Sequence, residues 1–289
     1  MDFEDFDKDR EEVINRAREG GVEKIINIGC NLERAKKSIE IAKNHDFICA
    51  VNERNENKFS FPSEQANTGL KPFIFASAGL HPQEADLGDE KFFSELKKLL
   101  KEPKVVAIGE CGLEYFGEHN NPKSREKQKE VFLRHLELAR KFKKPVIIHC
   151  RNAYSEILEI LKTEKENNPK LSGVVHFFSG RLSQAEEFLK LDFLLSFTGV
   201  ITFARDYDRV IKVVPLEKIM VETDAPFACP QSPEAIATGG RVAPVPYRGQ
   251  RNEPLYVKYV AQKIAELKGL DFEKVAQITT NNAQNLFGI

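Results

Sequence analysis

The chain has 289 residues, a length that fits one α/β barrel or two smaller domains. Lysine and arginine number 43 and aspartate and glutamate 44, so the net charge of −1 excludes a protein that attracts nucleic acid or anionic membranes through its overall charge. With 41% hydrophobic residues and 21 phenylalanines, the composition also excludes a disordered chain.

Neither a membrane anchor nor a disulfide framework is predicted. No uncharged stretch approaches the ~20 residues that cross a bilayer, and the acidic start MDFEDFDKDREEV lacks the apolar segment of a signal peptide. The five cysteines form no CxxC pair and stand far apart, at positions 30, 49, 111, 150 and 229. They predict reduced thiols in a cytoplasmic protein. The short uncharged stretches and the net charge of −1 predict that the protein does not bind membranes.

Seven short apolar runs alternate with longer segments of helical periodicity. The runs span residues 24–30, 73–80, 105–110, 145–150, 173–178, 193–199 and 218–224. Their β-branched and aromatic residues predict strands buried on both faces of a parallel sheet. The segments between them, such as 91–101, 128–142 and 155–166, have the apolar spacing of amphipathic helices. This order predicts a (β/α) barrel or an open doubly wound sheet.

Local signals subdivide this pattern. Ser183 followed by Glu186 predicts a capping box that starts the helix after the fifth run. Residues 52–72 form a polar stretch rich in Asn, Ser and Pro, which we interpret as an insertion loop in a single domain spanning 1–289. Residues 225–254 are rich in proline and follow the last strand, where a barrel keeps an active-site loop.

Four side chains of types that commonly bind metals lie at or near the ends of four separate runs. They are Glu110, His149, His176 and Asp224. The carboxyl ends of parallel strands meet on one face of a βα fold, so these side chains are expected to converge. Imidazole together with carboxylate suits Zn, Mn, Fe or Ni, and oxygen-rich variants suit Mg. The pattern therefore predicts a divalent-metal site.

Other polar residues near the strand ends are candidates for contacts with substrate: His81, Arg151, Ser179, Arg248 and Arg251. A phosphate oxygen would suit both the arginine guanidinium groups and the helix start after Ser179. A loop histidine with local partners, a helix-capping salt bridge and a solvated charge cluster are the structural alternatives. The remaining histidines, at positions 45, 119 and 135, are predicted to lie on the surface.

Several motifs in fixed order resemble the TatD-type metal-dependent deoxyribonuclease family. They are GLHP (79–82), GECGLEY (109–115), IHCR (148–151), HFFSG (176–180), ETDAPF (222–227), RNEP (251–254) and TTNNAQNLFG (279–288). The resemblance implies a TIM (β/α)8 barrel of the metal-dependent hydrolase type. It also implies two divalent ions (Mg, Mn or Zn) and hydrolysis of DNA phosphodiesters by metal-activated water, with single strands or DNA ends as the expected substrate. The sequence leaves the oligomeric state open, and a monomer is the favoured expectation.

The resemblance also assigns roles. Glu110 would bridge the metals, His149 and His176 would bind one of them, and Asp224 would bind the other or position the attacking water. Glu110 and Asp224 are thus the catalytic candidates.

The sequence departs from the family at its start, because it contains no His-x-His strand. We expect that strand to be encoded upstream of Met1. Without it the barrel has seven strands and cannot close, and the site of Glu110, His149 and His176 keeps one metal while the other site is weak. Two alternatives stay open: a catalytically weakened barrel that acts as a binding or regulatory protein, and an amidohydrolase-like enzyme acting on a small molecule.

Overall fold

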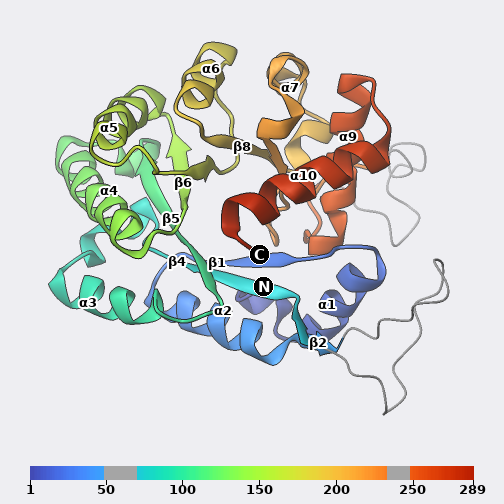
Figure 1. The fold of residues 1–289 in the computed structure, drawn as a ribbon, viewed down its shortest axis with the longest axis horizontal. Coiled ribbons are helices and arrows are strands. Elements are labelled where there is room, and N and C mark those ends of the chain that lie inside the picture. The colour runs from blue at the N-terminus through green and yellow to red at the C-terminus, as the bar shows by residue number, and fades with distance from the viewer. Residues whose placement is uncertain (49–69, 233–247) are drawn as a thin grey trace.

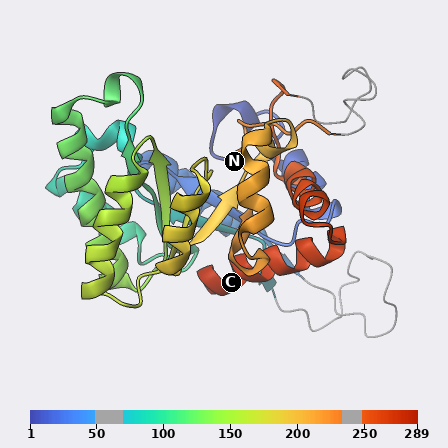
Figure 2. The same cartoon turned by 90° about the horizontal axis from the view of Figure 1, so that it is seen from above.

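Seven parallel strands form one curled sheet in the computed structural model, which describes residues 1–48, 70–232 and 248–289. The strands pair in chain order: β1 (Ile25–Gly29), β4 (Ile74–Ala78), β5 (Val105–Glu114), β6 (Val146–Arg151), β7 (Gly173–Val175), β8 (Leu194–Phe197) and β9 (Ile219–Val221). Within the described residues, β1 and β9 are the two edges of this sheet. The curled sheet with helices outside it confirms a TIM-barrel type of fold that is open on one side (Figures 1 and 2).

Helices follow the strands and pack against the sheet. They are α1 (Arg10–Glu19), α2 (Leu32–Asn44), α3 (Glu90–Leu99), α4 (Pro122–Phe142), α5 (Tyr154–Asn167), α6 (Leu182–Lys190), α7 (Asp208–Val213), α9 (Val257–Lys268) and α10 (Phe272–Phe287). Short 3-10 helices span Glu4–Phe6, Pro82–Leu87, Gly117–His119, Gly199–Thr202, Arg205–Tyr207, Leu216–Lys218 and Pro254–Tyr256. None of the helices in the described ranges is long and apolar enough to cross a membrane.

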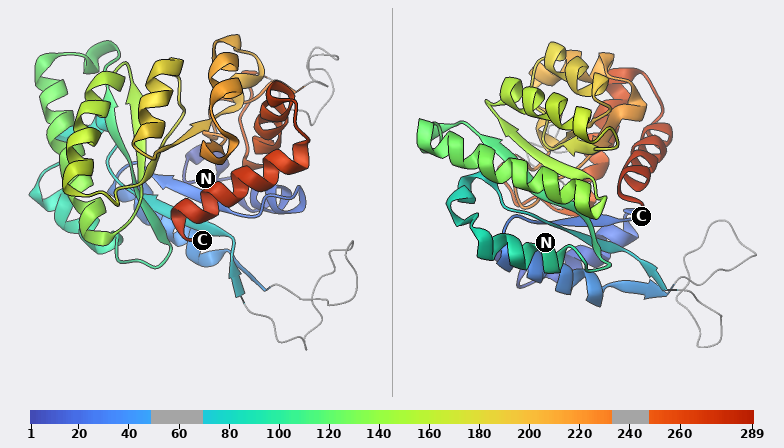
Figure 3. Two further views of the ribbon diagram at one scale, coloured as in Figure 1. Left: turned by 45° about the horizontal axis from the view of Figure 1, so that its top comes forward. Right: turned by 60° about the vertical axis from the view of Figure 1, so that its left-hand side comes forward.

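An apolar layer fills the inside of the curled sheet, on the amino-terminal side of the polar residues that follow on the same strands. It joins one residue from each of five strands to the end of α10: Ala107, Ile147, Val174, Leu194, Met220 and Phe287. The last helix runs across the strands toward the chain terminus in Figures 1 and 3. This layer supports the polar side chains that follow it along the same strands.

The predicted elements are largely confirmed, with some differences. Strand β5 continues to Glu114, four residues beyond the predicted end at Glu110. Helix α4 begins at Pro122, six residues before the predicted start at residue 128. The capping box at Ser183 is wrong, because α6 begins at Leu182 and the backbone N–H of Arg181 donates to Gln184 Oε1 at 2.7 Å.

A further difference concerns the predicted insertion loop. Its last residues, 70–72, form β3 (Leu70–Pro72), which pairs antiparallel with β2 (Asp46–Ile48). The rest of the predicted loop lies outside the described residues.

Candidate metal centre

Polar side chains stand directly above the apolar layer on the inner face of the sheet. Side chains on a strand alternate between its faces, so residues two positions apart point the same way. The inner-layer residues of β6, β7 and β9 are therefore followed, two positions later, by His149, His176 and Glu222. The strand pattern thus carries three polar groups to the carboxyl end of the half-barrel.

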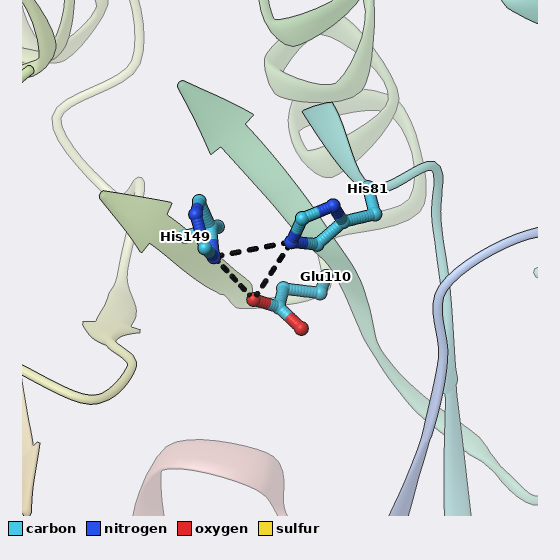
Figure 4. A group of neighbouring side chains, drawn as sticks. All are labelled: His81, Glu110 and His149. Carbon is cyan, nitrogen blue, oxygen red and sulfur yellow. Dashed lines mark hydrogen bonds and ion pairs between the residues drawn. The ribbon is translucent and has the colours of Figure 1, made fainter. Parts of the chain in front are cut away.

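The tightest group consists of His81, Glu110 and His149 (Figure 4). Oε1 of Glu110 on β5 lies 2.7 Å from Nδ1 of His149 on β6 and 3.7 Å from Nε2 of His81, which follows β4. The two imidazole nitrogens are 3.2 Å apart. Three neighbouring strands thus bring three potential ligand atoms to one point.

Glu110 is the electrostatic centre of this group. Burial by itself raises the pKa of this carboxyl, but His176 and His149 have the larger, opposing effect and hold it well below its ordinary value. Burial lowers the pKa of His149, yet the carboxylates of Glu110 and Glu114 raise it above its ordinary value. The buried carboxylate is therefore ionised and shared among imidazoles.

A second group surrounds His176, just beyond β7. Its Nε2 lies 3.8 Å from Glu110 Oε1 and 3.6 Å from Asp224 Oδ1. Its Nδ1 donates to Glu222 Oε2 at 2.6 Å. Burial lowers the pKa of His176, but Glu222 and Glu110 raise it well above its ordinary value. Glu110 thus joins both groups.

Glu222 is held firmly enough to orient this ring. Its Oε1 accepts hydrogen bonds from the backbone N–H of Phe177 and from Ser196 Oγ, each at 2.7 Å. With both carboxylate oxygens engaged, Glu222 directs Nε2 of His176 toward Glu110 and Asp224. A carboxylate behind an imidazole fixes its tautomer and orientation in many metal sites.

Glu114 has the same relation to His149. Its Oε2 lies 3.2 Å from Nε2 of His149, while its backbone N–H donates to Gln128 Oε1 at 2.8 Å. Gly112 lies between the two glutamates on β5, where φ is +147° and a Cβ would come within 2.0 Å of the His149 carbonyl oxygen. The glycine therefore permits the close approach of β5 to β6 that brings Glu114 to this ring.

The predicted substrate residues separate into two regions. His81 belongs to the tight group, and Arg151 lies 3.9 Å from Glu114 with its guanidinium 4.0 Å from the ring centre of Phe116. Ser179 Oγ is 3.0 Å from the hydroxyl of Tyr154 in the wall of a neighbouring cavity. These three surround the carboxyl end of the sheet.

The two arginines near the last strand are engaged elsewhere. Arg251 donates to both carboxylate oxygens of Asp9, at 2.8 and 2.6 Å, and to Glu253 at 3.1 Å. Arg248 lies 4.7 Å from the ring centre of Phe203. The structure gives Arg251 a structural ion-pair network and does not bring it to Glu110.

Two of the three remaining histidines correct the sequence interpretation. His135 is fully buried and His45 is 9% exposed, although both were predicted to lie on the surface. Each ring donates to a backbone carbonyl four residues earlier, since His135 Nδ1 donates to Val131 at 2.7 Å and His45 Nδ1, just after α2, donates to Ile41 at 2.6 Å. A polar ring on the inner side of an amphipathic helix is buried when such a partner is available.

The sequence reasoning missed Glu114 and Glu222 as parts of this centre. Both carried a usable signal, because Glu114 lies in the same GECGLEY motif as Glu110, and Glu222 is two positions before Asp224. Their partners, however, are histidines of other strands.

The donor set fits a divalent cation. Two atoms bound to one zinc ion at ~2.0–2.2 Å are at most ~4.4 Å apart. The separations of 2.7, 3.2 and 3.7 Å in the tight group meet that condition, as do 3.6 and 3.8 Å around His176. Imidazole nitrogens and carboxylate oxygens are also suitable ligands for such ions. His81, Glu110 and His149 can therefore hold a divalent metal, and His176 and Asp224 lie next to them.

Comparison with known sequences agrees with this chemistry. The model of the family described as TatD related DNase matches residues 1–52 and 56–288. A Bacillus subtilis (strain 168) protein called uncharacterized metal-dependent hydrolase YabD is 36% identical over 100% of this chain and 96% of its own length. An Erwinia amylovora protein named 3'-5' ssDNA/RNA exonuclease TatD is 30% identical over 98% of this chain and 95% of its own length.

Solved structures share the fold. The crystal structure of YjjV, a TatD homologue from Escherichia coli K12, superposes with a TM-score of 0.80 at 28% identity, covering 100% of this chain and 95% of that one. A TatD family hydrolase from Entamoeba histolytica gives 0.75 at 24% identity, covering 97% and 89%. With the family model matching nearly the whole sequence, the chain belongs to the TatD-related DNase family and is a metal-dependent hydrolase.

Proposed function

We propose that the protein hydrolyses phosphodiester bonds of DNA, with single strands or DNA ends as substrate, and uses a divalent metal held by Glu110, His149, His176 and Asp224. The observation that carries this proposal is the position of Glu110 Oε1, which lies 2.7 Å from His149 and 3.8 Å from His176 at the open end of the half-barrel. A relative named as an exonuclease for single-stranded DNA and RNA supports the choice of substrate.

The chemistry divides between the ion and the side chains. A bound divalent ion supplies Lewis-acid polarisation of a phosphoryl oxygen and makes water more acidic. The side chains orient the site, since Glu114 and Glu222 fix the rings of His149 and His176. Burial raises the pKa of Asp224 to about 7, against the opposing effect of His176. Asp224, whose Oδ1 lies 3.6 Å from His176 Nε2, would bind the ion or position the attacking water.

The choice of metal is part of the proposal. Mg, Mn and Zn are the candidates, and His81 next to Glu110 adds a nitrogen donor that suits Zn or Mn better than Mg.

The test combines metal binding with two substrates. Protein dialysed against EDTA is titrated calorimetrically with Mg²⁺, Mn²⁺ and Zn²⁺. Each form is then assayed with bis(p-nitrophenyl) phosphate, which reports phosphodiester chemistry alone, and with end-labelled single- and double-stranded oligonucleotides. We expect metal-dependent cleavage of both substrate types, with single strands preferred. Metal binding without cleavage of either substrate would contradict the proposal, and so would hydrolysis of amide or carboxyl-ester substrates alone.

A further inference from the structure

A cavity of about 480 Å³ lies beside the metal centre, among the loops that follow β5, β6 and β7. Its wall includes Tyr115, directly after Glu114, and Asn152, directly after Arg151. Ser179, three residues after His176, lies in the same wall. The segments that carry the metal-centre residues therefore continue directly into this cavity, whose volume is typical of ligand sites.

The cavity is positively charged although the whole chain carries −1. Arg125 and Arg181 line it, and neither makes an ion pair with a carboxylate in residues 1–48, 70–232 and 248–289. The partners of Arg125 are neutral: Nε donates to Asn120 Oδ1 at 2.8 Å, and the guanidinium lies 4.3 Å from the ring centre of Tyr115 in the same wall. The acidic residue of the wall, Glu156, is already compensated, because Lys129 lies 3.2 Å from its Oε1. Two cations are thus left for a ligand.

Both helices that begin here reinforce this charge. Helix α5 begins at Tyr154 and α6 at Leu182, and residues at both starts line the cavity. A helix amino terminus carries a partial positive charge and backbone N–H groups that favour anions. The cavity therefore suits an anion with several oxygen atoms, such as a phosphate.

The shape of the region favours a chain of phosphates over a single free anion. A second cavity of about 770 Å³ adjoins the first, and the two share Arg125 and Glu156 as wall residues. The two cavities therefore adjoin near the start of α4. A nucleic acid strand with one phosphate at Glu110 carries further phosphates that could occupy these neighbouring cavities.

We propose that this cavity is a second phosphate subsite, in which Arg181 and Arg125 bind a backbone phosphate of the strand that flanks the phosphodiester at the metal centre. The subsite rests on the proposed nuclease function and explains how a chain of nearly zero net charge holds a nucleic acid strand. It supplies affinity without sequence preference, because phosphates carry no base information.

The experiment compares Arg181→Ala and Arg125→Ala with the wild type and with Arg140→Ala. Arg140 is an exposed residue of the last turn of α4, at the opposite end of the helix that carries Arg125, and is the matched control for charge. The binding of a fluorescein-labelled 15-nucleotide thymidine strand is followed by anisotropy in EDTA over a range of salt concentrations. Cleavage of the same strand and of bis(p-nitrophenyl) phosphate is measured with added metal.

Each cavity variant is expected to reduce the salt slope of log K by ~0.7, the value for one lost single-strand phosphate contact. Cleavage of the oligonucleotide should fall by about tenfold in kcat/KM. Hydrolysis of bis(p-nitrophenyl) phosphate should stay at the wild-type rate, because this substrate has no flanking phosphate. Arg181→Lys, which keeps the charge, should restore most of the salt slope.

The outcomes separate the two proposals. If both cavity variants match the wild type and Arg140→Ala in salt slope and in KM for the oligonucleotide, the subsite is overturned and the nuclease function stands. If the wild type cleaves neither substrate, the nuclease function fails, while an altered salt slope still identifies the cavity as a phosphate site. An equal loss of activity on both substrates would also overturn the subsite, because the arginines would then act on the metal centre.

Discussion

His176 and His135 are both buried, yet their environments shift their pKa values in opposite directions. Around His176, beyond β7, Glu222 and Glu110 overcome the effect of burial and raise the pKa well above its ordinary value. Around His135, in α4, burial lowers the pKa to about 4, since its two hydrogen-bond partners are backbone groups and carry no charge. Burial alone therefore does not identify a functional histidine. Carboxylates on both ring nitrogens distinguish the metal centre from a structural hydrogen bond.

His135 is nevertheless connected to the metal centre through a hydrogen bond to the residue before His81. Its Nε2 accepts a hydrogen bond from the backbone N–H of Leu80 at 3.1 Å, and its Nδ1 donates to the Val131 carbonyl. Leu80 directly precedes His81, so His135 connects α4 to the loop that carries one member of the tight group. The comparison predicts that substitutions around His176 act on metal binding, whereas those at His135 act on stability.

Glu110→Gln should have the largest effect, because it removes the charge that three imidazoles share. Metal affinity is expected to fall by more than the ~10–100-fold typical of residues behind the ligands, as measured by calorimetric titration with Mn²⁺ or Zn²⁺. Circular dichroism would confirm that the variant is folded. Wild-type affinity in a folded variant would place the ion away from Glu110.

Glu222→Gln should have the next largest effect on the same measurement. The amide keeps the shape of the side chain but loses the charge that orients His176, so metal affinity should fall by ~10–100-fold. Glu217→Gln is the control, since Glu217 is exposed next to the start of β9. Equal affinities of the two variants would show that Glu222 does not position the ring.

His135→Ala should lower the stability of the protein and leave metal affinity largely unchanged. It leaves the buried N–H of Leu80 without its acceptor, which costs ~1–3 kcal/mol of unfolding free energy, measured by urea denaturation. Metal affinity should change less than in Glu222→Gln. The comparison is wrong if His135→Ala reduces the free energy of metal binding by more than it reduces the free energy of unfolding.

The smallest expected effect is a pH dependence of stability that His135 contributes. Its folded pKa is about 4, while an unfolded histidine has ~6.5, so between these values only the unfolded state binds the proton. Stability from this group is therefore complete above pH ~6.5 and is lost as the pH falls toward 4. At pH 5.5 the loss is ~1.4 kcal/mol, which corresponds to one pKa unit.

The measurement compares the pH profiles of wild type and His135→Gln in urea, so that the other titrating groups cancel. The wild type should lose more stability than the variant between pH 7 and pH 5.5. Parallel profiles would show that His135 does not titrate differently in the folded and unfolded states.

Much of the fold was predictable because its strand signals are local. The runs IFASA of β4 and LLSF of β8 are buried at every position, as strands covered on both faces must be. The residues at the strand ends were predictable for the same reason, since parallel strands present them on one face. The start of α6 was not predictable in this way. Ser183 and Glu186 have the spacing of a capping box, but the side chain that caps the helix start is that of Gln184, which accepts a hydrogen bond from the backbone N–H of Arg181.

The sequence by itself predicted seven parallel strands in a barrel-type sheet and placed Glu110, His149, His176 and Asp224 within or after four of them. Tertiary structure decided which charges meet. Arg251 pairs with Asp9, 242 residues away, whereas Arg181 has no ion-pair partner within the described residues. An apolar run is a property of neighbouring residues, but the partner of a charge depends on how the curled sheet brings distant segments together. Sequence therefore identifies the donors, and only the folded structure shows which of them are free for a ligand.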